Sequence, residues 1–282
     1  MARRLKRIGF VDNNLDNFHS SVYLKLFRND LKSTGFVVAG GTGVLKKKSQ
    51  TWAAENQVSY FGSVQDLNEV VDYFMVLAPS NPEKHLELCK SVFPYGKPTY
   101  VDKTFAPDLR TAQAIFDLAD RHKVPMQTSS ALRYSGVQEY LMEVEREQVK
   151  HMVTWGGGRS FGEYAIHPLE MAISCMGPGV RRVMRRGTGR HSQLLLSFTG
   201  GRTAVVNVYT NARTPYAASV TTSEGTKYIQ VDSSKIFLNT AKAVIEMFKA
   251  RRANIDRKES LIIRRILDVA DQKRSTRGFV AL

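Results

Sequence analysis

The sequence predicts an α/β chain of two domains, a doubly wound parallel sheet followed by an α+β domain with an open, mostly antiparallel sheet. Over the first half, apolar strand-like runs alternate with helical patterns, which is typical of a parallel sheet covered on both faces. After about residue 150 these give way to strand candidates separated by glycine turns. Because 282 residues suffice for two cores, we place the domains at 1–130 and 131–282.

The first domain begins with a short apolar strand, a tight polar turn and an amphipathic helix. The same alternation then continues to about residue 130. The predicted elements are strand Ile8–Val11, helix Phe18–Leu31, strand Gly35–Ala39, helices Trp52–Asn56 and Asp66–Val71, strand Tyr73–Leu77, helix Pro82–Val92, strand Thr99–Val101, helix Asp108–His122 and strand Val124–Gln127.

The second domain opens with an acidic helical turn and one further helix, and it closes with two helices that pack back. Between them, glycines mark the turns of a strand-rich region, and we interpret Gly156–Gly158 as a turn as well. The predicted elements are helical turn Leu141–Glu147, helix Ile166–Cys175, strands Val180–Met184, Ser192–Thr199, Thr203–Asn211, Ala217–Thr222 and Tyr228–Val231, and helices Ile236–Ala250 and Lys258–Gln272.

Composition indicates an ordinary globular protein, with 43% hydrophobic and 24% charged residues. The N-terminal run Met1–Arg7 is basic, but the apolar stretch after it is too short for a signal peptide, and no segment is long enough to span a membrane. Cys89 and Cys175 lie far apart on apolar patterns, which favours buried reduced thiols over a disulfide. We therefore expect a cytoplasmic protein.

The net charge of +15 is unevenly distributed, at about +3 in residues 1–150 and about +12 in residues 151–282. Such a basic half can mark an anionic substrate, an acidic partner or nucleic acid. No helix-turn-helix, zinc-knuckle or RNA-binding aromatic motif accompanies the charge, so we favour a solvated basic surface and expect no nucleic acid as partner. The sequence predicts no metal site.

The first strand, turn and helix have the context of the dinucleotide-binding fingerprint G-x-G-x-x-G, so the first domain is predicted to be Rossmann-like. Its three glycine positions read Asp12, Asn14 and Asn17. Glycine is needed there because the backbone must approach a pyrophosphate closely, and carboxylates at Asp12 and Asp16 would repel it. The acidic residue expected after the second strand is replaced by Gly40–Gly43. The sequence thus predicts that the phosphate-binding site of the fingerprint is altered.

Four later segments, in order and at matching spacing, resemble the glucose–fructose oxidoreductase / inositol dehydrogenase / MocA family, and the resemblance covers nearly the whole chain. The segments are Leu77–His85, Gly96–Ala106, Ser130–Tyr134 and Gly156–Glu170. The resemblance implies a Rossmann domain coupled to an open-faced sheet domain that oxidises or reduces sugars and polyols with NAD or NADP. It also implies assembly into a homo-oligomer through that sheet.

The resemblance also implies roles for individual residues. Lys103 would hold a substrate hydroxyl, His167 would exchange the proton, and both would converge on one cleft; Glu163 lies one helical turn before His167 and could orient it. Histidine suits proton exchange near neutral pH, and a lysine offsets developing alkoxide charge. The implied cofactor residues are Asp12, Asn13, Asn14, Pro79, Asn81 and Asp102, and the implied substrate residues are Arg133, Tyr134 and Tyr164.

Three hypotheses for function follow. The leading one is an NAD(P)-dependent oxidoreductase acting on a sugar, polyol or related hydroxy compound, with weak or atypical cofactor binding. The second keeps the cleft but drops the hydride chemistry, as a lyase, hydratase or epimerase would, and needs no dinucleotide. The third is a non-catalytic binding or regulatory subunit whose basic second domain docks an acidic partner.

Overall fold

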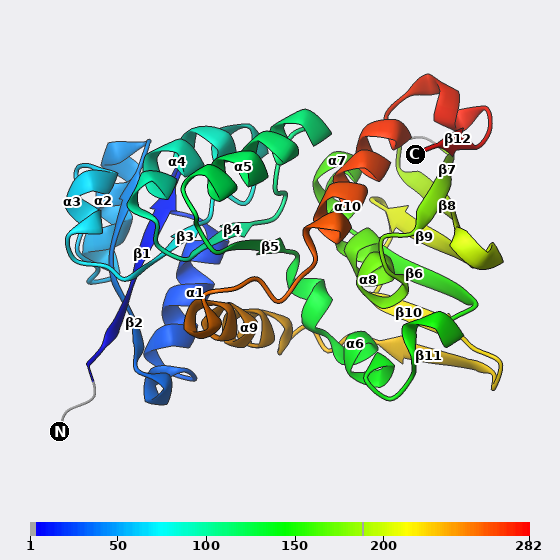
Figure 1. Ribbon diagram of the computed structural model, residues 1–282, viewed down its shortest axis with the longest axis horizontal. Coiled ribbons are helices and arrows are strands. Elements are labelled where there is room, and N and C mark those ends of the chain that lie inside the picture. Colours follow the sequence, from blue (N-terminus) through cyan, green and yellow to red (C-terminus); the bar gives the residue numbers. More distant parts are fainter. Residues whose placement is uncertain (1–3, 188) are drawn as a thin grey trace. The chain divides into compact units, whose positions relative to one another are not determined.

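The structure, a computed structural model, describes residues 4–187 and 189–282, so the first three residues of the basic N-terminal run lie outside it. The chain forms two compact units (Figure 1). The first contains the residues up to Ser129 and the later segment Thr240–Ile255. The second contains Ser130–Asn239 and Asp256–Leu282. The first unit is therefore built from two separate segments of the chain.

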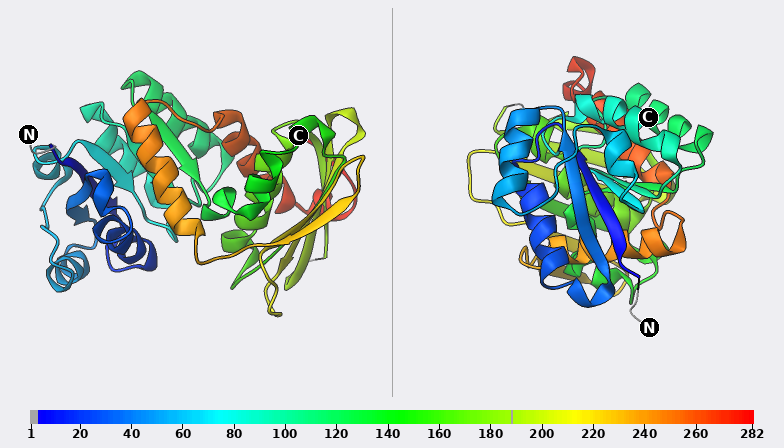
Figure 2. Two further views of the ribbon diagram at one scale, coloured as in Figure 1. Left: turned by 90° about the horizontal axis from the view of Figure 1, so that it is seen from below. Right: turned by 90° about the vertical axis from the view of Figure 1, so that its left-hand side faces the viewer.

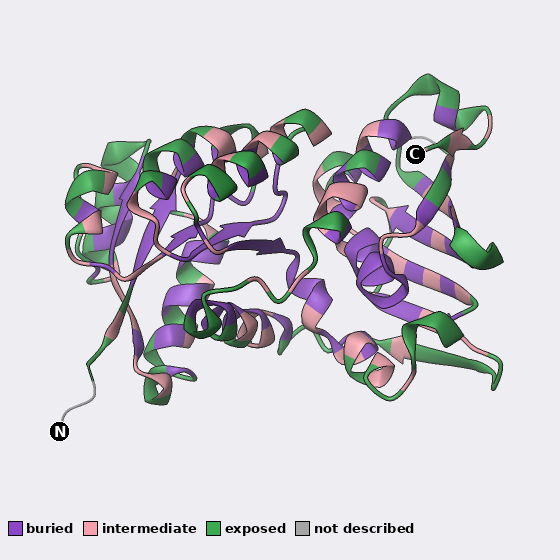
Figure 3. Cartoon of the chain, viewed as in Figure 1, coloured by how far each residue is buried: buried purple, intermediate pink, exposed green. Residues whose placement is uncertain are grey.

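The first unit is built on a five-stranded parallel sheet in the order β2-β1-β3-β4-β5, as predicted. Its strands are largely buried because helices cover both faces (Figure 3). The switch in strand order between β1 and β3 is where open α/β sheets form ligand crevices. The strands are β1 (Lys6–Asp12), β2 (Phe36–Gly43), β3 (Tyr73–Val76), β4 (Thr99–Asp102) and β5 (Met126–Ser129).

Helices α4 and α5 lie on one face of this sheet, and α1 and α9 lie on the other (Figure 1). Helix α9 comes from the far end of the chain, and its Phe248 stacks on Tyr73 of β3 with ring centroids 4.6 Å apart. This aromatic contact fixes α9 to the sheet. The helices are α1 (Phe18–Arg28), α2 (Lys46–Glu55), α3 (Val64–Asn68), α4 (His85–Val92), α5 (Leu109–Arg121) and α9 (Ile236–Ala250).

The second unit is built on a seven-stranded sheet in the order β11-β10-β6-β9-β8-β7-β12. Every neighbouring pair is antiparallel except β6 and β9, which are parallel, so the predicted mostly antiparallel sheet is confirmed. The strands are β6 (His151–Gly157), β7 (Val180–Arg186), β8 (His191–Phe198), β9 (Thr203–Tyr209), β10 (Ala217–Thr221), β11 (Thr226–Gln230) and β12 (Val280–Ala281).

Helices of the second unit, with α8 and α10 foremost, pack on one face of this sheet (Figure 2). Helix α8 is buried along nearly its whole length and forms the centre of the apolar core. The helices are α6 (Gly136–Leu141), α7 (Phe161–Tyr164), α8 (Ile166–Met176) and α10 (Arg257–Ala270). Short 3-10 helices cover Lys32–Thr34, Pro82–Lys84, Phe93–Tyr95, Ala131–Tyr134, Arg146–Gln148, Thr199–Gly201 and Lys273–Thr276.

Two sequence interpretations were wrong. Gly156 and Gly157 were taken as a turn, but they end strand β6, which the sequence did not predict. A Cβ on Gly156 would lie 2.9 Å from Pro168, and one on Gly158 would lie 2.0 Å from the Tyr164 ring, so packing requires glycine there. The acidic helical turn predicted at 141–147 is helical only at its ends, because Leu141 ends α6 and Arg146–Gln148 form a 3-10 helix.

Among the residues that the structure describes, no helix is both long and apolar enough to cross a membrane.

Candidate functional site

Seven of the predicted site residues lie at the carboxyl edge of the first unit's sheet. Asp12 ends β1, Pro79 and Asn81 follow β3, and Asp102 with Lys103 ends β4. Two hydrogen bonds join them across the edge. The Asn13 amide donates to Asn81 Oδ1 at 3.2 Å, and the buried Lys103 ammonium donates to the Pro79 carbonyl at 3.2 Å. The fold therefore gathers Asp12, Asn13, Asn14, Pro79, Asn81, Asp102 and Lys103 at one edge.

The Asp12 carboxylate is folded into the loop that it begins. Its side chain is buried, at 1% exposure. It accepts hydrogen bonds from the Asn14 backbone N–H at 3.0 Å, from Asn17 Nδ2 at 2.9 Å and from the backbone N–H of Ala78. Burial raises the pKa of Asp12, and the nearby negative charge of Asp102 adds to the rise. A carboxyl group of the protein itself therefore occupies this turn.

Asn17 closes the amino terminus of α1. Its Oδ1 accepts the backbone N–H groups of His19 at 2.8 Å and Ser20 at 3.1 Å, as in an ordinary N-cap. Its Nδ2 donates to the Asn14 carbonyl at 2.7 Å as well as to Asp12. In a glycine fingerprint, such helix N–H groups face the pyrophosphate. These residues therefore do not fit a pyrophosphate in the usual pose.

Asp102 is also engaged within the protein. Its carboxylate lies 2.5 Å from Nδ1 of His19 and accepts the Lys103 backbone N–H at 2.8 Å. The Tyr100 hydroxyl donates to the Asp102 carboxylate at 3.3 Å. The peptide bond between Lys103 and Thr104, which follows Asp102, is cis. His19 was missed by the sequence analysis, although its position in the first turn of a helix that starts at this edge was a usable signal.

The glycines that replace the expected acidic residue belong to strand β2 itself. A Cβ on Gly40 would lie 2.4 Å from the Phe61 ring, and one on Gly43 would lie 2.2 Å from Ser49 Oγ. Close packing therefore accounts for these glycines without a nucleotide. The run Lys46–Lys48 begins α2 and is exposed to solvent.

In the second unit, His167 lies in the first turn of α8 and is half-buried. Its Nδ1 is 2.7 Å from Ser130 Oγ, and its ring lies against two tyrosines, with centroid distances of 5.8 Å to Tyr164 and 6.0 Å to Tyr216. Burial raises the pKa of Tyr216 to about 12, and the proximity of Tyr164 adds to the rise, so this phenol is neutral at physiological pH. The imidazole ring of His167 is therefore in contact with the Ser130 hydroxyl and with the rings of Tyr164 and Tyr216.

Glu163 lies in the short helix α7, and His167 lies in the first turn of α8. Helices α7 and α8 meet at Ala165, whose own backbone is in the right-handed helical region (φ −60°, ψ −27°). The partner of Nδ1, Ser130, lies 37 residues away in the chain, and the sequence analysis gave its hydroxyl no role.

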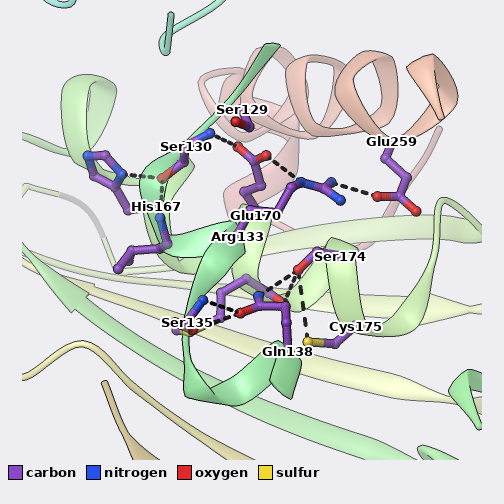
Figure 4. Close-up of polar contacts among 12 residues, drawn as sticks. Ser129, Ser130, Arg133, Ser135, Gln138, His167, Glu170, Ser174, Cys175 and Glu259 are labelled. Atoms are coloured by element: carbon purple, nitrogen blue, oxygen red, sulfur yellow. Dashed lines mark hydrogen bonds and ion pairs between the residues drawn. The ribbon is translucent and has the colours of Figure 1, made fainter. Parts of the chain in front are cut away.

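Arg133, which the resemblance implied to be a substrate residue, is held between two buried glutamates. Its Nε donates to Glu170 at 2.8 Å and one terminal nitrogen donates to Glu259 at 2.6 Å (Figure 4). Burial alone would lower the pKa of Arg133, but the two carboxylates raise it above its ordinary value. The Arg133 guanidinium is therefore fixed by ion pairs within the second unit. Tyr134 is half-buried beside it, and its carbonyl accepts a hydrogen bond from Asn239.

The predicted residues thus fall into two groups. Lys103 and the cofactor residues belong to the first unit, and Arg133, Tyr134, Glu163, Tyr164 and His167 belong to the second. Within residues 4–187 and 189–282, no group of three or more His, Cys, Asp or Glu side chains is placed to hold a metal ion.

No protein-family model matches the sequence. No protein of curated function matches it either. Solved structures do match over the whole chain. Apo scyllo-inositol dehydrogenase from Lactobacillus casei has a TM-score of 0.82 at 12% identity, covering 100% of this chain and 99% of that one. Myo-inositol 2-dehydrogenase from Lactobacillus plantarum has a TM-score of 0.82 at 11% identity, covering 99% and 100%.

GenD2 from gentamicin A biosynthesis, solved in complex with NAD, has a TM-score of 0.81 at 12% identity, covering 100% of this chain and 97% of that one. At such identities the likeness concerns the fold. The chain therefore has the fold of these dehydrogenases, which is the fold that the resemblance to the glucose–fructose oxidoreductase / inositol dehydrogenase / MocA family implied.

Proposed function

We propose that this chain is an oxidoreductase that acts on a hydroxyl group of a sugar, polyol or related compound, with an atypical site for its nicotinamide dinucleotide. The fold shared with inositol dehydrogenases and with an NAD complex supports the reaction class. The observation that carries the proposal is the His167 imidazole, fixed by the Ser130 hydroxyl at 2.7 Å. An oriented imidazole is what proton exchange with an alcohol requires.

A bound nicotinamide would supply the hydride chemistry, and the chain's own residues would handle the proton and the charge. His167 takes the hydroxyl proton during oxidation and returns it during reduction. For the Lys103 ammonium, which donates to the Pro79 carbonyl within the first unit, we keep the role that the resemblance implied, which is to offset negative charge on a substrate hydroxyl. The atypical feature is the loop at 12–17, since its donors are bonded to Asp12 and Asn17 rather than open to phosphate.

We expect His167→Ala to lower kcat by about 10²- to 10⁴-fold, the usual contribution of general acid–base catalysis. Lys103→Met should cause a comparable loss while preserving the apolar stem. Initial rates are measured by the absorbance of the reduced nicotinamide with a panel of inositols and aldoses. His151→Ala, on the opposite face of the sheet from α8, is the control and should keep full rate. Full activity in His167→Ala would remove it from the mechanism.

The closed loop favours a second candidate, a non-redox acid–base enzyme that uses the same histidine and lysine without a dinucleotide. The two candidates differ in one observable. A lyase or epimerase exchanges a substrate C–H proton with deuterated solvent in the absence of dinucleotide, whereas the proposed oxidoreductase does not. Native mass spectrometry of freshly purified protein also reveals a retained dinucleotide.

We further propose that the second unit's sheet pairs with another copy of the chain. Its face opposite α8 carries an apolar row across four neighbouring strands, because Val153, Val205, Leu195 and Met184 are paired in register. All four are half-buried, and no helix of the second unit covers this face within the described part of the chain. An apolar row of this kind is typical of an interface.

Leu195→Glu should therefore weaken self-association by at least about tenfold, since it introduces a charge at the centre of this row. Light scattering and sedimentation at micromolar concentration measure the effect. Met142→Glu changes an exposed methionine after α6 and should leave the assembly unchanged. A wild-type chain that is monomeric at these concentrations contradicts the proposal.

A cytoplasmic location is part of the same proposal. Cys89 and Cys175 are buried and unpaired, and burial raises the pKa of both thiols, that of Cys175 to about 12. Such inert reduced thiols suit a reducing compartment.

A further inference from the structure

Ser130 is placed to control the imidazole of His167. Its side chain is fully buried, and its Oγ caps the 3-10 helix Ala131–Tyr134 by accepting the Leu132 backbone N–H at 3.2 Å. The same Oγ lies 2.7 Å from Nδ1 of His167 (Figure 4). The Ser130 hydroxyl oxygen thus contacts both the start of the 3-10 helix Ala131–Tyr134 and the His167 ring.

The backbone of Ser130 is fixed independently of its hydroxyl. Its N–H donates to Glu170 Oε2 at 2.6 Å, and Arg133 holds the other oxygen of that carboxylate at 2.8 Å. Glu170 lies three residues after His167 on α8, so the same helix carries the ring and the group that anchors the ring's partner. The distance between Ser130 Oγ and His167 Nδ1 is therefore fixed by short contacts that connect both residues to Glu170 and to helix α8.

Ser130 can serve either protonation state of Nδ1. Its oxygen has two lone pairs and one proton, and Leu132 uses one lone pair. When Nδ1 carries no proton, the hydroxyl donates to it and the ring proton is on Nε2. When the hydroxyl rotates, it accepts Nδ1–H and leaves Nε2 as the base. A carboxylate in this place could only accept.

We propose that Ser130 is a positioning residue whose rotatable hydroxyl orients His167 and lets its Nε2 act as acid or base. The inference rests on the proposed function, since it assigns the proton exchange to His167. In the oxidation direction Nε2 takes the substrate proton while Nδ1–H donates to Ser130. In the reduction direction the doubly protonated ring gives its Nε2 proton to the substrate oxygen while Nδ1–H still donates to Ser130 Oγ, which returns the neutral Nδ1–H ring.

The test is a comparison of Ser130→Ala with wild type by ¹⁵N NMR of labelled histidine, with His167→Gln assigning the ring signals. We expect the neutral ring in wild type to carry its proton mainly on Nδ1, where Ser130 Oγ accepts it, and Ser130→Ala to lose this preference and shift both nitrogen signals. Ser130→Thr keeps the hydroxyl and should restore the wild-type spectrum. Ser129→Ala is the matched control, because Ser129 Oγ is buried and makes no hydrogen bond among the described residues.

Turnover provides the second readout. Ser130→Ala should lower kcat by about tenfold or more with little change in KM, because small displacements of a catalytic group cost up to ~100-fold. Thermal melting verifies that each variant is folded, and Ser130→Cys replaces any that is not. Unchanged His167 nitrogen signals in folded Ser130→Ala overturn the inference. Shifted signals in a protein that turns over no substrate refute the proposed function and leave the positioning role intact.

Discussion

Arg133→Met should lower the free energy of unfolding by about 3–5 kcal/mol, the usual effect of removing one partner from a buried ion pair. Arg133 is the cation between Glu170 and Glu259, and all three side chains are buried. Methionine fills a similar volume but leaves Glu170 without its counter-ion and leaves Glu259 with Arg146 alone. Urea titration followed by circular dichroism measures the loss.

The loss of unfolding free energy in Arg133→Met should grow as the pH rises. Burial already raises the pKa of Glu170 above its ordinary value of 4.5, and Arg133 offsets part of that rise. Without Arg133, the pKa of Glu170 rises further. A carboxyl with a raised pKa in the folded state binds more protons there than in the unfolded state, so stability falls as pH rises through that range. The variant should therefore be closest to wild type in acid and furthest from it near neutrality.

Two variants control this experiment. Arg146→Met removes a guanidinium that is 42% exposed and that, of the two glutamates, contacts only Glu259, so its effect should be smaller. Adding Glu170→Gln and Glu259→Gln to Arg133→Met removes the unpaired charges and should recover much of the loss. A loss below about 1 kcal/mol at neutral pH, the scale of an exposed ion pair, would show that the cluster contributes little.

Free NAD and NADP should bind this chain well over tenfold more weakly than they bind a relative with a glycine fingerprint. A carboxylate a few ångströms from a pyrophosphate costs on the order of a few kcal/mol at intermediate dielectric, and each 1.4 kcal/mol is about tenfold in affinity. Asp12 supplies that charge, and Asn17 occupies the helix N–H groups that would offset it. Isothermal titration with both dinucleotides measures the affinity.

The double variant Asp12→Gly/Asn17→Gly should regain at least about tenfold in affinity, because it removes both the charge and the cap. Asp16→Gly is the matched control, since Asp16 is an exposed carboxylate of the same loop and should have a smaller effect. Low-micromolar binding by wild type, with phosphates on the turn from Asn13 to Phe18, would falsify the electrostatic argument.

The elements that the sequence predicted correctly are those with strong local patterns. The run from Ile8 into helix α1 and the amphipathic helix α5 are defined by apolar spacing within one or two turns. Strand β6 was missed because its glycines satisfy both a turn pattern and a packing requirement, and only the tertiary packing, such as that of Gly156 against Pro168, distinguishes the two. Its parallel pairing with β9, about 50 residues later, has no local signal.

By itself, the sequence determined the order of the elements that it predicted, the change from a parallel to a mostly antiparallel sheet, and the loss of the fingerprint glycines. Each of these depends on residues that are neighbours in the chain. Only the tertiary structure decided the partners of the polar groups. Ser130 meets His167 across 37 residues, and Arg133 meets Glu259 across 126. The physical reason is that a buried charge or hydroxyl needs a hydrogen-bond or ion-pair partner. Which residue becomes that partner depends on the tertiary fold and not on the spacing of residues along the chain.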